Sequence, residues 1–190
     1  MPVYHIERGG HADMHRVYPM LCFDFHDWER PLEFECQRAL LRGAELLLLK
    51  DQQNAECGYA LMLKNRLSGY VLLGWLSVYP HIRGGGIGGE FLRLIREYYA
   101  RWEGILLEVT EYPALEKARK LNAFYKRNGY ADVNCRYFLG GRETQLMYLP
   151  LAGARDIAPV IKSVVRSVYE CMYCERALAN LVRIEKDEDA

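Results

Sequence analysis

The sequence lacks a long uninterrupted hydrophobic run. Its longest apolar stretch, Tyr70 to Pro80, is broken by Gly74 and Ser77, and it is much shorter than the roughly 20 residues that cross a bilayer as a helix. The amino terminus also lacks the basic segment followed by an apolar core that marks a secretory signal. These two absences argue against a membrane protein and favour a cytoplasmic one.

The chain also lacks a net charge, because its 25 lysines and arginines balance 25 aspartates and glutamates over 190 residues. No bulk attraction therefore draws it to nucleic acid or to an anionic membrane. Hydrophobic residues make up 51% of the chain and charged residues 26%, which is typical of a folded globular protein. Any polyanionic ligand must be held by a local site.

Cysteine and histidine show no metal-binding arrangement. The six cysteines are scattered along the chain, as in a reduced intracellular protein, so we expect free thiols. Cys171 and Cys174 form a Cys-x-x-Cys pair, but no second pair completes a four-ligand zinc site. We therefore expect no bound metal.

Hydrophobic periodicity divides the chain into strands and helices. Strands are expected over residues 3–7, 45–50, 57–63, 70–79, 105–110, 133–138 and 143–149, and helices over 12–23, 28–42, 91–102 and 113–128. The strands between 45 and 79 are joined by short polar turns, which predicts an antiparallel meander. The strand at 105–110 follows a helical crossover and should run parallel to the strand before it. The pattern predicts an α/β (α+β) fold with a mixed sheet, a central parallel strand pair and flanking helices.

Residues 151–190 form a segment of a different kind. Apolar residues recur at helical spacing from Ile157 to Tyr173, and we expect one amphipathic helix over 157–184 with an acidic tail behind it. We interpret this segment as an appendage of the same domain. Because a long apolar stripe has to be covered, the helix should dock on its own sheet or pair with a second copy of the chain as a homodimer.

Five glycines in six positions follow the most apolar strand and precede the most regular helix. Glycine lets a ligand approach the backbone, and the first amides of a helix have no internal partners, so this junction suits a phosphate or a diphosphate. The spacing Gly84-x-Gly86-x-x-Gly89 matches the dinucleotide-binding fingerprint, with Glu108 about 20 residues further on. Only one strand-helix-strand unit can be drawn, however, so a dinucleotide-binding protein is the weaker alternative.

Two segments resemble the signatures of the GNAT superfamily of acetyl-CoA-dependent N-acetyltransferases. Residues 83–88 resemble its arginine-x-x-glycine-x-glycine motif, and residues 122–130, Asn-Ala-Phe-Tyr-Lys-Arg-Asn-Gly-Tyr, resemble its second signature. The resemblance covers roughly residues 3–149, which implies a GNAT domain over 1–150. It implies a transferase with acetyl-CoA as cosubstrate and a primary amine as acceptor.

The resemblance also implies roles for individual residues. Backbone donors of the loop would hold the diphosphate, and a donor near Val78 would polarise the acetyl carbonyl. Tyr125 matches the tyrosine that protonates the departing thiolate. Residues 65–89 contain no carboxylate, so the general base is sought at Glu108 first and at Glu111 second. The cofactor-binding set is therefore Val78, Arg83, Gly84, Gly85, Gly86, Ile87, Gly88 and Gly89, and the catalytic set is Tyr125, Glu108 and Glu111.

The acceptor is expected to be a small cationic amine. Glu108 and Glu111 would stand at the end of the strand over 105–110, and Tyr79 and Tyr112 would line the same mouth and offer their faces to an ammonium group. The second hypothesis is a GNAT-fold module that senses acetyl-CoA without turnover and recruits a partner through its C-terminal helix. One departure from the family pattern is Ala118, which stands where many members carry a pantetheine-facing asparagine.

Overall fold

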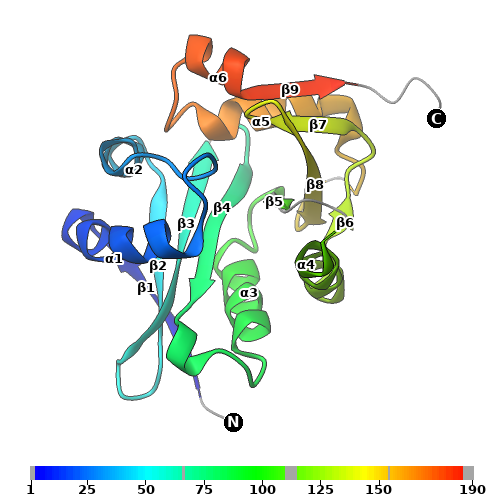
Figure 1. Ribbon diagram of the computed structural model, residues 1–190. Coiled ribbons are helices and arrows are strands. Elements are labelled where there is room, and N and C mark those ends of the chain that lie inside the picture. The colour runs from blue at the N-terminus through cyan, green and yellow to red at the C-terminus, as the bar shows by residue number, and fades with distance from the viewer. Residues whose placement is uncertain (1–2, 66, 110–114, 154, 186–190) are drawn as a thin grey trace.

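The computed structural model describes residues 3–65, 67–109, 115–153 and 155–185. Its strands are His5–Gly9 (β1), Glu45–Lys50 (β2), Glu56–Asn65 (β3), Tyr70–Val78 (β4), Gly104–Val109 (β5), Ala131–Asp132 (β6), Arg136–Leu139 (β7), Arg142–Pro150 (β8) and Val182–Glu185 (β9). Within the described ranges they form one sheet in the order β1-β2-β3-β4-β5-β8-β7-β9, with β6 beside β8 (Figure 1). The pair β4 and β5 is parallel and the other pairs are antiparallel, which confirms the predicted mixed sheet.

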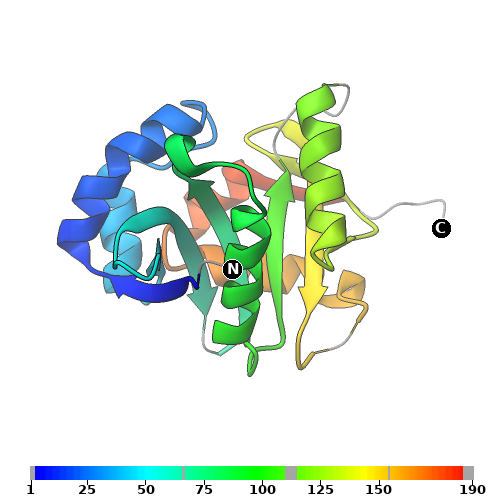
Figure 2. The ribbon, with the colours of Figure 1, turned by 90° about the horizontal axis from the view of Figure 1, so that it is seen from below.

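Helices cover both faces of this sheet. They are His11–Asp24 (α1), Glu33–Leu41 (α2), Ile87–Tyr98 (α3), Glu116–Arg127 (α4), Ile161–Tyr169 (α5) and Glu175–Leu181 (α6), with short 3-10 turns at Pro80–Ile82 (η1) and Ala158–Val160 (η2). Residues of α1, α2 and α5 share one buried cluster with the sheet, and residues of α3 and α4 share the other. In Figure 2, α3 and α4 accordingly lie on the same side of the sheet. No helix within the described ranges has both the length and the apolar character to cross a membrane.

The second helix begins later than the sequence pattern predicts. We expected it over 28–42, but α2 starts at Glu33. Pro31 disfavours helical angles at Arg30, which favours a helix start after Pro31. The Glu35 carboxylate accepts a hydrogen bond from the Leu32 amide at 2.8 Å, which caps the new start. Residues 25–32 are therefore a connection and not a helical turn.

The strand β4 changes the way it faces at Gly74. Leu73 packs on the α3 and α4 side, whereas Trp75 packs on the α1 and α5 side, although strict alternation puts residues two apart on the same face. The register with β3 shifts at the same place, between Leu61 and Met62, so Gly74 is the extra residue of a β-bulge. Pairing with β5 covers only Tyr70–Leu73 of β4. Beyond the bulge, β4 leaves β5.

The single helix expected over 157–184 is wrong. The segment forms η2 and α5, ends its helix at Tyr169, starts again as α6 after an extended Cys174, and finishes as strand β9 paired with β7. The alternating Val182-Arg183-Ile184-Glu185 suits a strand, and the Arg183 guanidinium lies 4.0 Å from the centre of the Phe138 ring. The segment docks on its own sheet, because Ile161, Val164 and Val168 of α5 are buried with residues of β3 and β4.

Candidate active site

The glycine loop connects the end of β4 to α3 through η1. Gly84, Gly85 and Gly86 have φ angles of 109°, 58° and 83°, a region in which a side chain is strained. A Cβ at any of these three would meet nothing within 4 Å, so the surface beside the loop is open. Gly88 and Gly89 have a different role, because a Cβ there would lie 3.3 Å from Phe124 and from Asn128 of the α4 end.

The loop offers free backbone donors at the amino end of α3. Two amides are already used within the turns: Arg83 N–H donates to Pro80 O at 3.4 Å and Ile87 N–H to Gly84 O at 3.2 Å. The amides of the five glycines have no backbone acceptor among the described residues. These donors, together with the positive end of the helix dipole, form a site that suits an anion such as a diphosphate.

The Arg83 side chain points back to β4. Its Nε donates to the Val78 carbonyl at 2.8 Å, and its Nη2 lies 2.7 Å from Asp24 Oδ1 at the end of α1. Ser77 Oγ donates to the other oxygen of Asp24 at 2.5 Å. The guanidinium therefore fixes the loop against β4 and α1, and its partner is a protein carboxylate.

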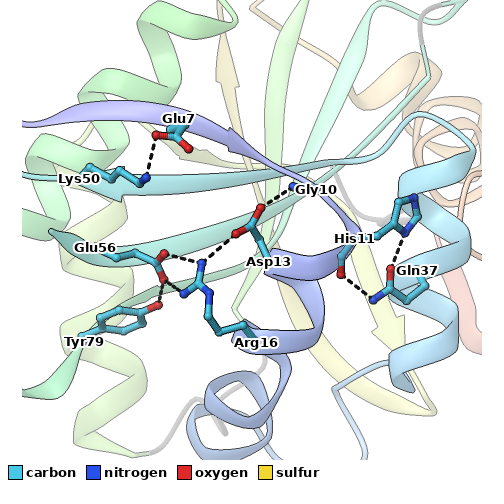
Figure 3. Close-up of polar contacts among 9 residues, drawn as sticks. All are labelled: Glu7, Gly10, His11, Asp13, Arg16, Gln37, Lys50, Glu56 and Tyr79. Carbon is cyan, nitrogen blue, oxygen red and sulfur yellow. Dashed lines mark hydrogen bonds and ion pairs between the residues drawn. The ribbon is translucent and has the colours of Figure 1, made fainter. Parts of the chain in front are cut away.

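A second polar network anchors the residue that starts the loop (Figure 3). Arg16 of α1 makes two hydrogen bonds to the Glu56 carboxylate, at 2.8 and 2.7 Å, and a third to Asp13 at 3.0 Å. The Tyr79 hydroxyl donates to the same Glu56. Burial raises the pKa of Glu56, but the hydrogen bonds from Arg16 and Tyr79 outweigh it, so the pKa lies below its usual value. Tyr79 is thus held away from the mouth that we expected it to line, and that expectation is wrong.

The outer half of β4 presents a free edge toward β5. Tyr79 N–H donates to Cys57 O of β3 at 2.9 Å. Because successive amides of a strand point to opposite sides, the amides of Val78 and Leu76 point away from β3. Pairing with β5 has ended at Leu73, so these groups face the space between the two strands. A linear ligand can bind there as an added strand does.

The cavity at this gap has a volume of about 350 Å³ and brings the two main catalytic candidates together. Tyr125 lies on the side of the sheet that α3 and α4 cover. Side chains two residues apart in a strand share a face, so Glu108 points to the same side as Leu106, the side that α5 covers. Both line one cavity because the gap between β4 and β5 connects the two faces. Its other lining residues include Asp24, Phe25, Trp28, Glu29, Arg30, Lys117, Leu121, Leu139, Tyr173 and Leu181. Glu111 and Tyr112 lie outside the described residues.

Tyr125 is a buried phenol at the wall of the cavity. Burial raises its pKa to about 12, so the hydroxyl stays protonated at any physiological pH. Its ring packs against Phe124 and Tyr130, with centroids 5.2 and 5.8 Å away. A phenol of this kind can donate a proton to a developing thiolate, whose own pKa is near 8.5.

Glu108 is a half-buried carboxylate held by two tyrosines. The Tyr169 hydroxyl lies 2.9 Å from Oε1 and 2.8 Å from Oε2, and the Tyr137 hydroxyl donates to Oε1. Burial raises the pKa of Glu108 above its usual value, while the two hydrogen bonds act in the opposite direction. A carboxylate with a raised pKa beside a cavity is suited to accept a proton.

The sequence pattern missed the acceptor-side residues of this cavity. Trp28 and Glu29 lie on the connection before α2, which we had assigned to a helix, and Tyr137 and Tyr169 come from β7 and α5. No local motif joins these positions, because they are up to 141 residues apart and meet only in the folded chain. The one available signal is the count of 14 tyrosines, which does not say which of them meet.

The comparisons agree with this geometry. The family model of the acetyltransferase (GNAT) domain matches residues 42–132. Among solved structures, a GNAT-family protein from Bacteroides thetaiotaomicron superposes with a TM-score of 0.72 at 17% identity, covering 87% of this chain and 96% of that one. The ribosomal-protein-S18-alanine N-acetyltransferase from Escherichia coli gives 0.62 at 18% identity, covering 80% and 96%. No curated protein is detectably similar in sequence.

The chain therefore has the fold of GNAT-family acetyltransferases, and its residues 42–132 match the model of the acetyltransferase (GNAT) domain, whose family generally uses acetyl-CoA. The dinucleotide interpretation loses its basis, because β4 and β5 are the one parallel pair in the described sheet. Glu108 is also bonded to tyrosines of β7 and α5, so it does not stand as the free ribose-binding acid of that fingerprint.

Proposed function

We propose that this protein transfers the acetyl group of acetyl-CoA to a primary amine of a small cationic molecule. One observation carries the proposal: the free edge of β4, Tyr125 and Glu108 line a single cavity at the gap between β4 and β5. A donor site for the cofactor, a proton donor and a proton acceptor are thus within one space. These are the three parts that amine acetylation requires.

The residues present fit the cofactor. The five free glycine amides of the loop over 84–89 would bind the diphosphate, since they combine open backbone donors with a helix amino terminus. The edge of β4 beyond Gly74 would hold the pantetheine arm through its backbone. The Val78 amide, which points into the gap, would donate to the acetyl carbonyl oxygen; in enzymes, removing one such donor costs about 10²–10³ in rate. Arg83 would act indirectly, by holding this loop against β4.

The proton transfers follow from the two side chains. Glu108 would take a proton from the ammonium group, directly or through water, and so free the nitrogen lone pair for attack on the acetyl carbon. As the new C–N bond forms and the C–S bond breaks, Tyr125 would donate its phenolic proton to the sulfur. The second amine proton is released, Tyr125 is reprotonated from solvent, and the products are the acetamide and the free thiol.

The charge and aromatic content of the cavity support a cationic acceptor. Tyr169 and Tyr173 line the cavity together with the half-buried Glu108, and aromatic faces beside a carboxylate attract an ammonium group. The cationic side chains there are neutralised in part, since Arg30 is bonded to Asp27 and Arg83 to Asp24. One structural relative is a spermidine N-acetyltransferase chimera from Vibrio cholerae and hSSAT, with a TM-score of 0.61 at 13% identity, covering 78% of this chain and 96% of that one.

The test is a turnover assay with acetyl-CoA and a panel of polyamine, aminoglycoside, peptide and amino-acid acceptors. The rate is measured as the release of free thiol. A cationic acceptor should give the highest kcat/KM. Glu108→Gln should lower that value by about 10²–10⁴, as expected for loss of a general base. The matched control is Glu143→Gln, which changes an exposed carboxylate of β8 outside the cavity. A preference for anionic acceptors, or an unaffected Glu108→Gln variant, contradicts the proposal, and acetyl-CoA binding without turnover on the whole panel supports a sensing module.

A further inference from the structure

The two hydroxyl groups that hold Glu108 come from outside the part of the chain matched by the family model. That match ends at residue 132, whereas Tyr137 belongs to β7 and Tyr169 is the last residue of α5. The Tyr169 oxygen bridges both carboxylate oxygens of Glu108, at 2.9 and 2.8 Å, and Tyr137 donates to Oε1. The acceptor side of the site is therefore completed by the C-terminal third of the chain.

We propose that Tyr169, assisted by Tyr137, is a positioning residue that keeps Glu108 ionised and orients its Oε2 atom toward the acceptor amine. This inference rests on the proposed role of Glu108 as the base. Oε1 receives both hydroxyl groups, whereas Oε2 shares only the bond from Tyr169. Oε2 therefore keeps the larger remaining capacity to accept a proton.

The physical need for these donors comes from burial. A carboxylate removed from water favours its neutral form, and a neutral acid cannot act as a base. Hydrogen bonds to the ionised form oppose that effect, because a hydroxyl group forms a stronger hydrogen bond to a carboxylate than to the protonated acid. The same burial, together with Glu108 itself, raises the pKa of Tyr137 and of Tyr169 well above the ordinary value. Both phenols therefore remain donors over the whole working pH range.

The surroundings of Glu108 leave this task to the two tyrosines. The titratable and charged side chains that share its cavity are Asp24 from α1, Glu29 and Arg30 from the connection before α2, Arg83 from the loop, Lys117 and Tyr125 from α4, and Tyr173 after α5. Hydrogen bonds from Tyr137 and Tyr169 are the interactions that lower the pKa of Glu108. Removal of either hydroxyl should therefore act on the charge of Glu108 directly.

The backbone around Tyr169 is suited to hold the hydroxyl still. Val165 and Val168 of α5 are buried in the core, and the Tyr169 carbonyl accepts hydrogen bonds from the amides of Met172 and Tyr173, both at 2.9 Å. Arg38 of α2 donates to the Met172 carbonyl at 2.6 Å, which ties the following turn to the α1 and α2 side. A hydroxyl group held by such packed elements is already in place before the substrate binds.

The direct test measures the protonation of Glu108 without any turnover. The full chain is labelled with ¹³Cδ-glutamate, the Glu108 carboxyl signal is assigned by its loss in Glu108→Gln, and the signal is followed against pH by NMR. Tyr169→Phe should move this titration to higher pH. Tyr173→Phe is the matched control, since Tyr173 lines the same cavity and lies 5.9 Å from Tyr169, centroid to centroid, without a hydrogen bond to Glu108 in the described structure. An unmoved titration in Tyr169→Phe overturns the inference, whether or not the protein acetylates amines.

A kinetic measurement gives a second readout with the best acceptor of the panel. Tyr169→Phe should lower kcat/KM roughly tenfold at neutral pH and recover toward the wild-type value at higher pH, while the KM for acetyl-CoA stays the same. A loss that is equal at every pH indicates a structural role and contradicts the inference. If Tyr169→Phe does not fold, Tyr137→Phe removes the other hydroxyl and should shift the titration in the same direction. An unmoved titration in that variant overturns the inference as well.

Discussion

The two sides of the cavity are built in different ways. The cofactor side uses backbone atoms that are close together in the sequence: the edge of β4, the glycine loop and the start of α3 span residues 74–89. The acceptor side uses side chains from four distant segments, at residues 24–30, 108, 137–139 and 169–181. Backbone recognition of a constant ligand leaves a compact motif, whereas an acceptor pocket assembled from side chains leaves none.

The largest expected effect comes from removing the acceptor-side segment. Deletion of residues 154–190 takes away a buried set made of Ile157, Ile161, Val164, Val165, Val168, Tyr169 and Met172. Each such side chain contributes about 1.5–3 kcal/mol of burial, and the sum is comparable with the typical stability of about 5–15 kcal/mol for a whole domain. The truncated chain should be insoluble or unfolded, as measured by soluble yield and circular dichroism.

A pair of point variants separates the loss of buried side chains from the mere shortening of the chain. Val168→Ala changes a residue with 0% exposure, whereas Val160→Ala changes one that is 46% exposed nearby. The first should lower the free energy of unfolding by about 2 kcal/mol and the second by less than about 0.5 kcal/mol, in urea titrations. A soluble truncated chain with an unchanged Tm, or equal effects of the two point variants, would show that the segment is not part of the core.

This segment also marks the limit of what the sequence could predict. The antiparallel meander, the parallel strand and the glycine loop followed from local patterns, because each depends on neighbouring residues. The apolar stripe from Ile157 onward was interpreted as one helix, yet the extended Cys174 interrupts it and Val182–Glu185 pairs with β7, 43 or more residues away. Tertiary pairing overrides local helical spacing at such positions.

The candidate site shows the same division. The loop and Tyr125 could be located from two short motifs, and Glu108 from its place at the end of a strand. The partners of Glu108 could not be located, because Tyr137 and Tyr169 meet it only after β7 and α5 have docked. Pro31 is a local signal for the later helix start, because it disfavours helical angles at Arg30 and so favours a connection at Trp28 and Glu29.

The next effect in size concerns the reaction on the cofactor side. Tyr125→Phe should lower kcat by about 10²–10³ with little change in acetyl-CoA affinity, because the hydroxyl acts on the departing thiolate and not on the bound ground state. The measurement is steady-state kinetics combined with calorimetric binding of acetyl-CoA. Tyr130→Phe is the matched control: its buried hydroxyl has no partner in the described structure, and the ring lies 5.8 Å from that of Tyr125. Equal kcat values in the two variants would assign Tyr125 to packing.

A smaller effect tests the backbone site. Gly86→Val should weaken acetyl-CoA binding by about tenfold or more, because a side chain at φ 83° distorts the loop and covers its amides. Gly43→Val is the control for backbone strain. Gly43 follows α2 with a φ angle of 104°, and a Cβ there likewise meets nothing within 4 Å. Both variants should lose similar stability, and only Gly86→Val should lose affinity in calorimetry. Equal affinities in the two proteins place the diphosphate elsewhere.

The smallest effect concerns the stability cost of the half-buried Glu108 carboxylate on the acceptor side. Burial raises the pKa of Glu108 in the folded chain, so folding favours its protonated form. The stability that this group contributes is therefore complete below the unfolded pKa of about 4.3 and is lost as the pH rises through the folded pKa. Glutamine is neutral at every pH, so Glu108→Gln should match the wild-type Tm near pH 4 and exceed it at pH 8, with a difference that grows as the pH rises. A Tm difference that does not vary with pH in thermal melts would mean that Tyr137 and Tyr169 fully compensate the burial, and the acceptor side would then carry no stability cost for its base.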